Sequence, residues 1–165
     1  MNNCNALNSI ERLEQNYSNQ KIITGSFNLY IRGLVPNFND IDFIVPGTKE
    51  LELISQNMGY YIDEEIFGPR GTIYEIRLKI EGINIEVWRE TGEDYVFSKA
   101  LYPQEYELSN FKNKKLMLRP LDLLMLDYFK ATRDNDPESI MKNKSYQEKI
   151  DIIRVNKPLN NLFWK

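Results

Sequence analysis

Apolar residues along the first thirty positions change spacing twice. Over residues 5–17 they recur every three or four positions, which predicts an amphipathic helix. A short β-rich run at 21–24 predicts a strand, and a Gly-Ser turn follows it. Helical spacing resumes over 27–32 and ends at Gly33, a residue that commonly terminates helices. This stretch therefore predicts helix, strand, turn and helix.

The middle of the chain predicts more strands than helices. After a Pro-containing loop, residues 40–45 alternate charged and apolar side chains and stop at Pro46-Gly47, as a strand does. Residues 48–59 have helical spacing. From 72 to 88, two alternating runs flank Glu81-Gly82, which predicts a β-hairpin.

The last third predicts mainly helices. Pro120 suits a first helical position, Asp136-Pro137 a cap and helix start, and Ser145 to Glu148 a capping box. We find no repeat and no linker, so residues 1–165 are expected to form one domain. Its core is expected over about 5–118 and its helical C-terminal part over about 119–156. The predicted fold class is α/β (α+β), a mixed sheet followed by helices.

Composition narrows the functional classes. With 165 residues, 42% hydrophobic and 27% charged, the chain has an ordinary globular composition. It contains no apolar run near the roughly 18 residues that a membrane span needs, and its start lacks the layout of a secretory signal. We therefore expect a cytoplasmic protein without a membrane partner. The net charge of −3 gives no general attraction to nucleic acid.

The residues that are missing exclude several chemistries. Cys4 is the single cysteine and there is no histidine, so an internal disulfide and a Cys/His zinc site are excluded. Catalytic triads built on histidine are excluded as well. Carboxylates remain as the main candidates for acid, base and metal-binding roles, and any metal must bind oxygen ligands.

Asp40 and Asp42 form the first candidate site. Strand geometry places them on one face, about 7 Å apart at their bases. Two carboxylates on one strand repel each other unless a cation such as Mg²⁺ or Mn²⁺ neutralises them. Alternating charge is also typical of an ordinary half-exposed strand, so the pair alone does not decide between the two interpretations.

Two further features strengthen the metal hypothesis. Gly25-Ser26 lies on a strand-to-helix turn, where glycine permits close backbone approach to phosphates. Glu86 lies alone on the polar face of its predicted strand and is the preferred third acid over Glu75, Glu81 and Glu90. A two-metal clamp for phosphoryl transfer needs such a third carboxylate.

Together these residues resemble the nucleotidyltransferase superfamily. The resemblance rests on Gly25-Ser26, a thirteen-residue spacer, Asp40-Ile41-Asp42-Phe43 and Glu86, and covers about residues 20–90. It implies a nucleotidyltransferase-like mixed sheet and transfer of a nucleoside monophosphate from a triphosphate such as ATP to an acceptor hydroxyl. By the same resemblance, Asp40, Asp42 and Glu86 would be catalytic and would hold Mg²⁺ or Mn²⁺. Gly25 and Ser26 would bind the phosphates.

The helical third adds two candidate nucleotide-binding residues. Small members of this superfamily carry a Lys-x-x-Arg helix beside the site, and Lys130 and Arg133 resemble that feature. Arginine and lysine both neutralise phosphate. An ion pair of either residue with Asp151, joining two helices, is the competing interpretation.

Three functions remain open at this stage. The favoured one is an active nucleotidyltransferase. The second is a catalytically degenerate nucleotidyltransferase fold that acts as a nucleotide-binding or protein-binding regulatory module. The third is another metal-dependent phosphoryl transfer, such as a nuclease. The sequence does not indicate whether the acceptor is a small molecule, RNA or protein.

Overall fold

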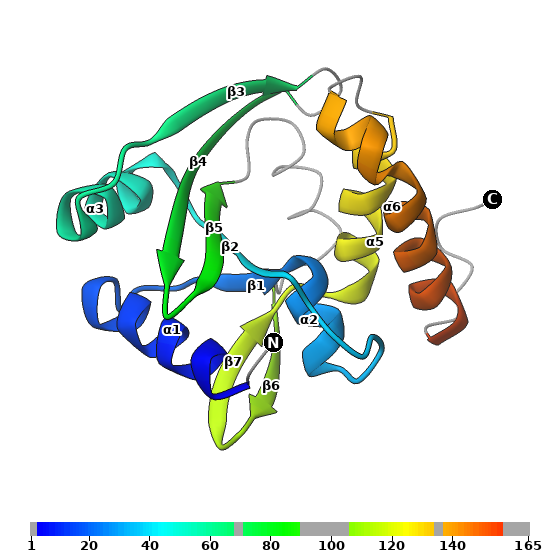
Figure 1. Ribbon diagram of the computed structural model, residues 1–165, viewed down its shortest axis with the longest axis horizontal. Coiled ribbons are helices and arrows are strands. Elements are labelled where there is room, and N and C mark those ends of the chain that lie inside the picture. Colours follow the sequence, from blue (N-terminus) through cyan, green and yellow to red (C-terminus); the bar gives the residue numbers. More distant parts are fainter. Residues whose placement is uncertain (1–2, 68–70, 90–105, 134–136, 157–165) are drawn as a thin grey trace.

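A mixed seven-stranded sheet forms the centre of the protein (Figure 1). The computed structural model describes residues 3–67, 71–89, 106–133 and 137–156. The strands are β1 (Ile22–Thr24), β2 (Asp40–Val45), β3 (Asp63–Phe67), β4 (Gly71–Ile80), β5 (Ile83–Arg89), β6 (Glu107–Phe111) and β7 (Lys114–Leu118). The helices are α1 (Asn3–Asn16), α2 (Gly25–Ile31), α3 (Thr48–Met58), α5 (Leu121–Ala131) and α6 (Pro137–Asn156).

The strand order is β3-β4-β5-β2-β1-β7-β6. Strand β2 pairs parallel to β5, and β1 pairs parallel to β7, while the other neighbours are antiparallel. Parallel pairs bring together strands that are distant in the sequence, since they need long connections. This order places the Asp-x-Asp strand between the Gly-Ser strand and the strand that carries Glu86.

One face of the sheet is apolar and covered by α1 and α3. Strand alternation places every second residue on this face. Its buried side chains form one cluster with apolar residues of the two helices. The strand members are Ile23, Ile41, Phe43, Val45, Ile76, Leu78, Ile80, Ile83, Ile85, Val87, Leu116 and Leu118. The members from α1 and α3 are Ala6, Ile10, Leu13, Leu51 and Ile54, and Phe27 of α2 also belongs to the cluster. The alternate residues of β2 and β5, including the candidate acids, therefore lie on the opposite face.

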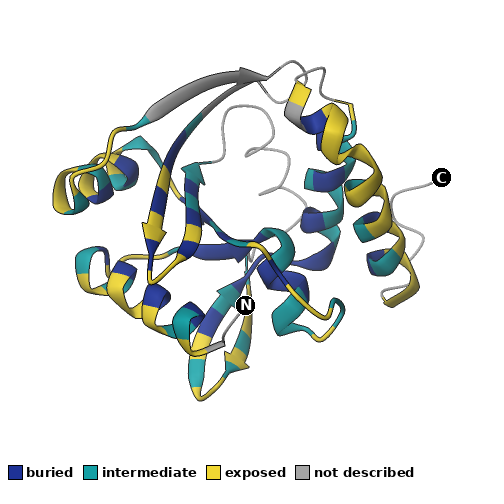
Figure 2. Cartoon of the chain, viewed as in Figure 1, coloured by how far each residue is buried: buried dark blue, intermediate teal, exposed yellow. Residues whose placement is uncertain are grey.

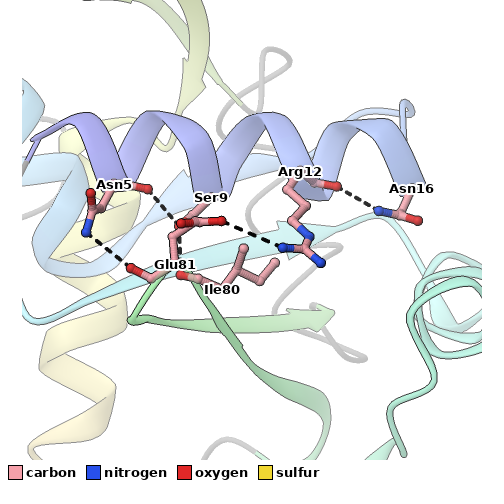
Figure 3. A network of polar contacts seen from close by, with 6 residues as sticks. All are labelled: Asn5, Ser9, Arg12, Asn16, Ile80 and Glu81. Atoms are coloured by element: carbon pink, nitrogen blue, oxygen red, sulfur yellow. Dashed lines mark hydrogen bonds and ion pairs between the residues drawn. The ribbon is translucent and has the colours of Figure 1, made fainter.

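Helix α1 is tied to the β4–β5 hairpin by the buried hydroxyl of Ser9. The Ser9 hydroxyl lies within hydrogen-bond distance of both Asn5 O, at 2.7 Å, and Ile80 O, at 2.8 Å (Figure 3). At the turn, Asn5 Nδ2 donates to Glu81 O, and Arg12 lies 3.7 Å from the Glu81 carboxylate. These contacts fix α1 on the apolar face.

A second, smaller apolar cluster joins α2 to α5 and α6. Its buried members are Leu29, Leu121, Leu124, Tyr128, Ile150 and Ile153. Helices α5 and α6 pack together on the side of the molecule opposite α1 and α3 (Figure 1). The outer side of α6 is exposed (Figure 2). Within the described residues, none of the helices combines the length and apolar character that crossing a membrane requires.

Several sequence predictions are confirmed and others are wrong. The strand over 40–45 has the predicted bounds, and the β-hairpin turns at Glu81-Gly82 as expected. The sequence did not predict β3 or the β6–β7 hairpin, whose strands carry many polar residues. Helix α6 begins at Pro137 and continues through Ser145, so the helix start at Ser145 was wrong; Asp136 lies outside the described residues.

Candidate active site

Gly25 lies directly against the carboxylate of Asp42. Its φ is +63°, and a Cβ added there would lie 1.6 Å from Asp42 Oδ2 and 2.7 Å from Asp42 Cγ. No side chain fits in that space, and an L residue is also strained at this φ. The turn and the carboxylate can be this close only because residue 25 is glycine.

The next residue of the turn contacts the other aspartate. Ser26 Oγ donates a hydrogen bond to Asp40 Oδ1 at 3.2 Å. Strand β1 delivers the turn to this place, since Thr24 pairs with Asp42 across the antiparallel β1–β2 ladder. Consecutive residues of one turn therefore touch both carboxylates of the Asp-x-Asp pair.

Glu86 is the neighbour of Asp42 on the other side. The two residues are paired in the parallel β2–β5 ladder, so their side chains project from the same face. Arg77 pairs with Glu86 from β4 and lies 2.5 Å from the buried Glu75 carboxylate. Glu81 belongs to the hairpin turn beside α1, and the fourth acid considered, at position 90, lies outside the described residues.

The electrostatics of Asp42 reflect this crowding. Burial is the largest cause that raises the pKa of Asp42 well above its ordinary value, and the charges of Asp40 and Glu86 raise it further. The lysines Lys149 and Lys142 act in the opposite direction. Because two further carboxylates crowd the buried Asp42, added positive charge is favourable at this place.

The aspartates could hold a metal ion only together with ligands from outside the described residues. Among the described residues, no group of three acidic or cysteine side chains is arranged closely enough to hold a metal ion. Mg²⁺ in nucleotide enzymes is typically bound by one or two carboxylates together with substrate phosphates and water. Asp40 and Asp42, flanked by a turn without a side chain at residue 25, match that kind of donor set.

Tyr128 on α5 contributes a buried hydroxyl on the helical side of the site. The residue is 6% exposed, and its hydroxyl has no hydrogen-bond partner within the described part of the chain. Burial raises the pKa of Tyr128 well above its ordinary value, and the charges of Asp42, Asp127 and Asp40 add to the effect. A buried polar atom without a partner is costly, so a site for a ligand is a reasonable explanation.

Lys149 on α6 is a cation that the sequence interpretation did not select. Its Nζ lies 5.1 Å from the ring centroid of Tyr128 and 5.7 Å from that of Tyr146. Burial lowers the pKa of Lys149, whereas Asp40 and Asp42 act to raise it. The signal was present: residues 146, 149, 150 and 153 follow helical spacing on the packed face of α6, and one of them is a lysine.

The roles assigned to Lys130 and Arg133 stay predictions. The Arg133 guanidinium carbon lies 4.2 Å from the ring centroid of Phe129, and Arg133 is exposed. Asp151, their alternative partner, lies 3.6 Å from Arg154 and accepts a hydrogen bond from Gln147. The lysines whose charges act on Asp42 are instead Lys149 and Lys142.

Solved structures with a similar fold are nucleotidyltransferases. One, from Thermotoga maritima, is provisionally assigned as a nucleotidyltransferase; it has a TM-score of 0.57 at 15% identity, covering 92% of this chain and 96% of that one. Another is ANT(2")-Ia in complex with adenylyl-2"-tobramycin, with a TM-score of 0.56 at 16% identity, covering 92% and 87%.

The polyadenylate synthase of Megavirus has a TM-score of 0.51 at 14% identity. It covers 96% of this chain, which spans only 32% of that protein. Neither family models nor curated protein sequences give a match. The sheet order, the helical C-terminal part and these three structures together show that the chain has the nucleotidyltransferase fold.

Proposed function

We propose that the protein is a metal-dependent nucleotidyltransferase that transfers a nucleoside monophosphate from a nucleoside triphosphate to an acceptor hydroxyl. The observation that carries the proposal is the contact of the Gly-Ser turn with both aspartates. Gly25 meets Asp42, and Ser26 donates to Asp40. A turn with an open backbone beside paired carboxylates suits a triphosphate that brings Mg²⁺ or Mn²⁺ with it.

In this proposal two of the acids would hold the metal, and the third would accept the proton. Asp40 and Asp42 are the ligands, and Glu86 is the third acid beside them. When bound, the metal would stabilise the negative charge that develops on the transferred phosphoryl group and on pyrophosphate. The acceptor oxygen forms a bond to the α-phosphorus as the bond to pyrophosphate breaks, and Glu86 takes the acceptor proton.

The helical side would complete the phosphate site. Lys149 is held by two tyrosine rings next to the aspartates, so its ammonium is available as a point charge for phosphate oxygens. The Tyr128 hydroxyl can donate a hydrogen bond to the same group. Gly25 and Ser26 would contact the phosphates from the opposite side.

Calorimetric titration with non-hydrolysable triphosphates tests the proposal. We expect the wild-type protein to bind at least one of these triphosphate analogues, and to bind it only when Mg²⁺ is present. Asp40→Asn and Asp42→Asn should each abolish this binding, because they remove ligand charge. Asp151→Asn is the matched control, since Asp151 is an exposed aspartate on α6 that pairs with Arg154. Failure of wild type to bind any triphosphate would reject the proposal.

A turnover assay separates an enzyme from a binding module. Release of pyrophosphate should depend on an acceptor, and Asp42→Asn should eliminate it. Two chemically different acceptor sets are suggested by the similar structures, aminoglycosides such as tobramycin and RNA ends. Metal-dependent binding without turnover on either set, or on protein, would favour the regulatory module instead.

A further inference from the structure

The side chain of Asn28 makes three hydrogen bonds inside the protein, using both N–H donors and its carbonyl oxygen. Asn28 is fully buried in α2. Its Nδ2 donates to Ile23 O at 2.9 Å and to Arg119 O at 2.9 Å, and its Oδ1 accepts from Arg32 Nε at 2.7 Å. Two donors and one acceptor are thereby satisfied. Such a polar group, fully paired in a core, specifies one local arrangement.

The first of these bonds encloses the Gly-Ser turn. Ile23 precedes the turn and Asn28 follows it, so the bond between them closes a ring around residues 24–27. Helix α2 has only seven residues, and Thr24 makes no side-chain capping bond. Because a helix this short is marginal on its own, tertiary contacts must set its position. Asn28 supplies such a contact two residues from Ser26.

The second bond connects the turn to the helical side of the site. Arg119 follows β7, and its backbone N–H donates to the same Ile23 carbonyl at 2.9 Å. Its buried guanidinium forms an ion pair with the Asp127 carboxylate on α5, with Nε 2.6 Å from Oδ2 and Nη2 3.0 Å from Oδ1. Asp127 is adjacent to Tyr128. One chain of polar contacts therefore runs from Asn28, just after the Gly-Ser turn, through Arg119 to Asp127, the residue that precedes Tyr128.

We propose that Asn28 is a positioning residue that sets the Gly-Ser turn against Asp40 and Asp42. The inference rests on the proposed function, because the turn matters only if it meets a nucleotide. Asn28 itself lies in the core, without a place for substrate contact. It acts by holding Gly25 where its missing Cβ accommodates Asp42, and Ser26 where its hydroxyl reaches Asp40.

The test compares Asn28→Asp with Ser9→Ala. Asn28→Asp keeps the size of the side chain and the oxygen that accepts from Arg32. It replaces the amide nitrogen, which donates to Ile23 O and Arg119 O, by an oxygen that cannot donate when ionised. Ser9→Ala removes a buried hydroxyl that also contacts main-chain carbonyls, one of them in β4, which β5 and β2 separate from β1 in the sheet. Amide hydrogen exchange over residues 24–31 reports the position of the turn in the ligand-free protein. Titration with Mg²⁺ and the preferred triphosphate analogue reports the site.

For Asn28→Asp we expect exchange over 24–31 to be at least about tenfold faster and affinity at least about tenfold weaker, since small misplacements of a positioned group have effects of this size. Ser9→Ala should leave both within about twofold. If Asn28→Asp does not fold, Asn28→Ala replaces it. Exchange at the wild-type rate, or faster exchange with unchanged affinity, would overturn the inference.

The two proposals fail differently. Absence of triphosphate binding by wild type rejects the proposed function and, with it, a role of Asn28 in that function. Binding by wild type that persists in Asn28→Asp rejects the inference alone. Weaker binding by both Asn28→Asp and Ser9→Ala would attribute the loss to general destabilisation and would also overturn it.

Discussion

Residue 25 must be glycine for two reasons, its positive φ and the space that Asp42 occupies beside it, and substitutions at two glycines can separate these effects. Its φ is positive, and its missing Cβ leaves room for Asp42. Gly59 has a similar φ of +72° but open space where a Cβ would lie. Gly59→Ala should therefore lower the free energy of unfolding by about 1 kcal/mol, through backbone strain alone. Gly25→Ala should lower it further and should abolish triphosphate binding. Urea denaturation and calorimetry measure the two effects.

Equal losses of stability in Gly25→Ala and Gly59→Ala, with binding retained in both, would contradict this account. It would mean that the Asp42 carboxylate rotates away at little cost. The site would then tolerate a side chain in the turn, and the contact between Gly25 and Asp42 would not be needed for triphosphate binding.

Asp42 should make the ligand-free protein less stable as pH rises. Because its pKa is raised in the folded state, the unfolded chain releases this proton first, above the ordinary value of 3.8. The free energy of unfolding of wild type should therefore fall relative to Asp42→Asn as pH rises from about 4 through the raised folded pKa. Denaturation in a chelating buffer at several pH values measures this. A constant difference across pH would contradict it.

The residues of the acidic strand and the turn were predictable because each depends on local chemistry. Glycine permits a close approach, and alternation along β2 and β5 places the acids on one face. Lys149 and Tyr128 were not predicted, because their place beside Asp40 and Asp42 depends on how α5 and α6 pack. The available signal was Lys149, a charged residue on the otherwise apolar face of its helix.

At the scale of elements, α1 should contribute stability without affecting the site. Ser9→Ala leaves the Ile80 carbonyl without its hydroxyl partner, which should lower the free energy of unfolding by about 1–2 kcal/mol. Asn16→Ala, which removes an exposed side-chain hydrogen bond in the last turn of the same helix, should change the free energy of unfolding by no more than about 0.5 kcal/mol. Chemical denaturation measures both. Loss of triphosphate binding in Ser9→Ala would show that α1 influences the site.

Of the two α6 lysines whose charges act on Asp42, Lys149 and Lys142, we expect Lys149 to contact the triphosphate. Lys149→Met keeps an unbranched side chain beside the two stacked tyrosine rings and removes the ammonium, so triphosphate affinity should fall about tenfold or more. Lys144→Met removes an exposed charge from the same helix and should change affinity less than about twofold. Calorimetry at two salt concentrations measures both. Equal effects would assign the loss to the net charge of α6.

The β6–β7 hairpin could not be predicted because its turn and strands lack the usual sequence signals. The β6–β7 hairpin turns at Lys112 and Asn113, whose φ values are +47° and +67°, although two-residue hairpin turns of this kind favour glycine. Its strands are short and partly exposed, so apolar alternation is weak. Pairing with β1 through β7 gives the hairpin its place, and that contact is not visible in local sequence.

At the scale of the molecule, α2 joins the two apolar clusters. Phe27 is buried in the larger cluster, between the sheet and helices α1 and α3, and Leu29 is buried in the smaller cluster with α5 and α6. The candidate site has the sheet and the Gly-Ser turn on one side and Tyr128 with Lys149 on the other. A ligand that contacts both sides would therefore link two packing units that otherwise meet through α2 and the Arg119–Asp127 pair.

This arrangement predicts that a metal–triphosphate complex stabilises both sides together. At a hundredfold excess over its dissociation constant, the ligand should raise the free energy of unfolding by about 2.7 kcal/mol. Hydrogen exchange should slow in α2 and also in α5 and α6, because local opening of either side would cost the bound contacts. Asp40→Asn should remove both effects. Protection confined to the sheet and α2 would mean that Lys149 and Tyr128 do not contact the triphosphate, even if the acids bind its metal.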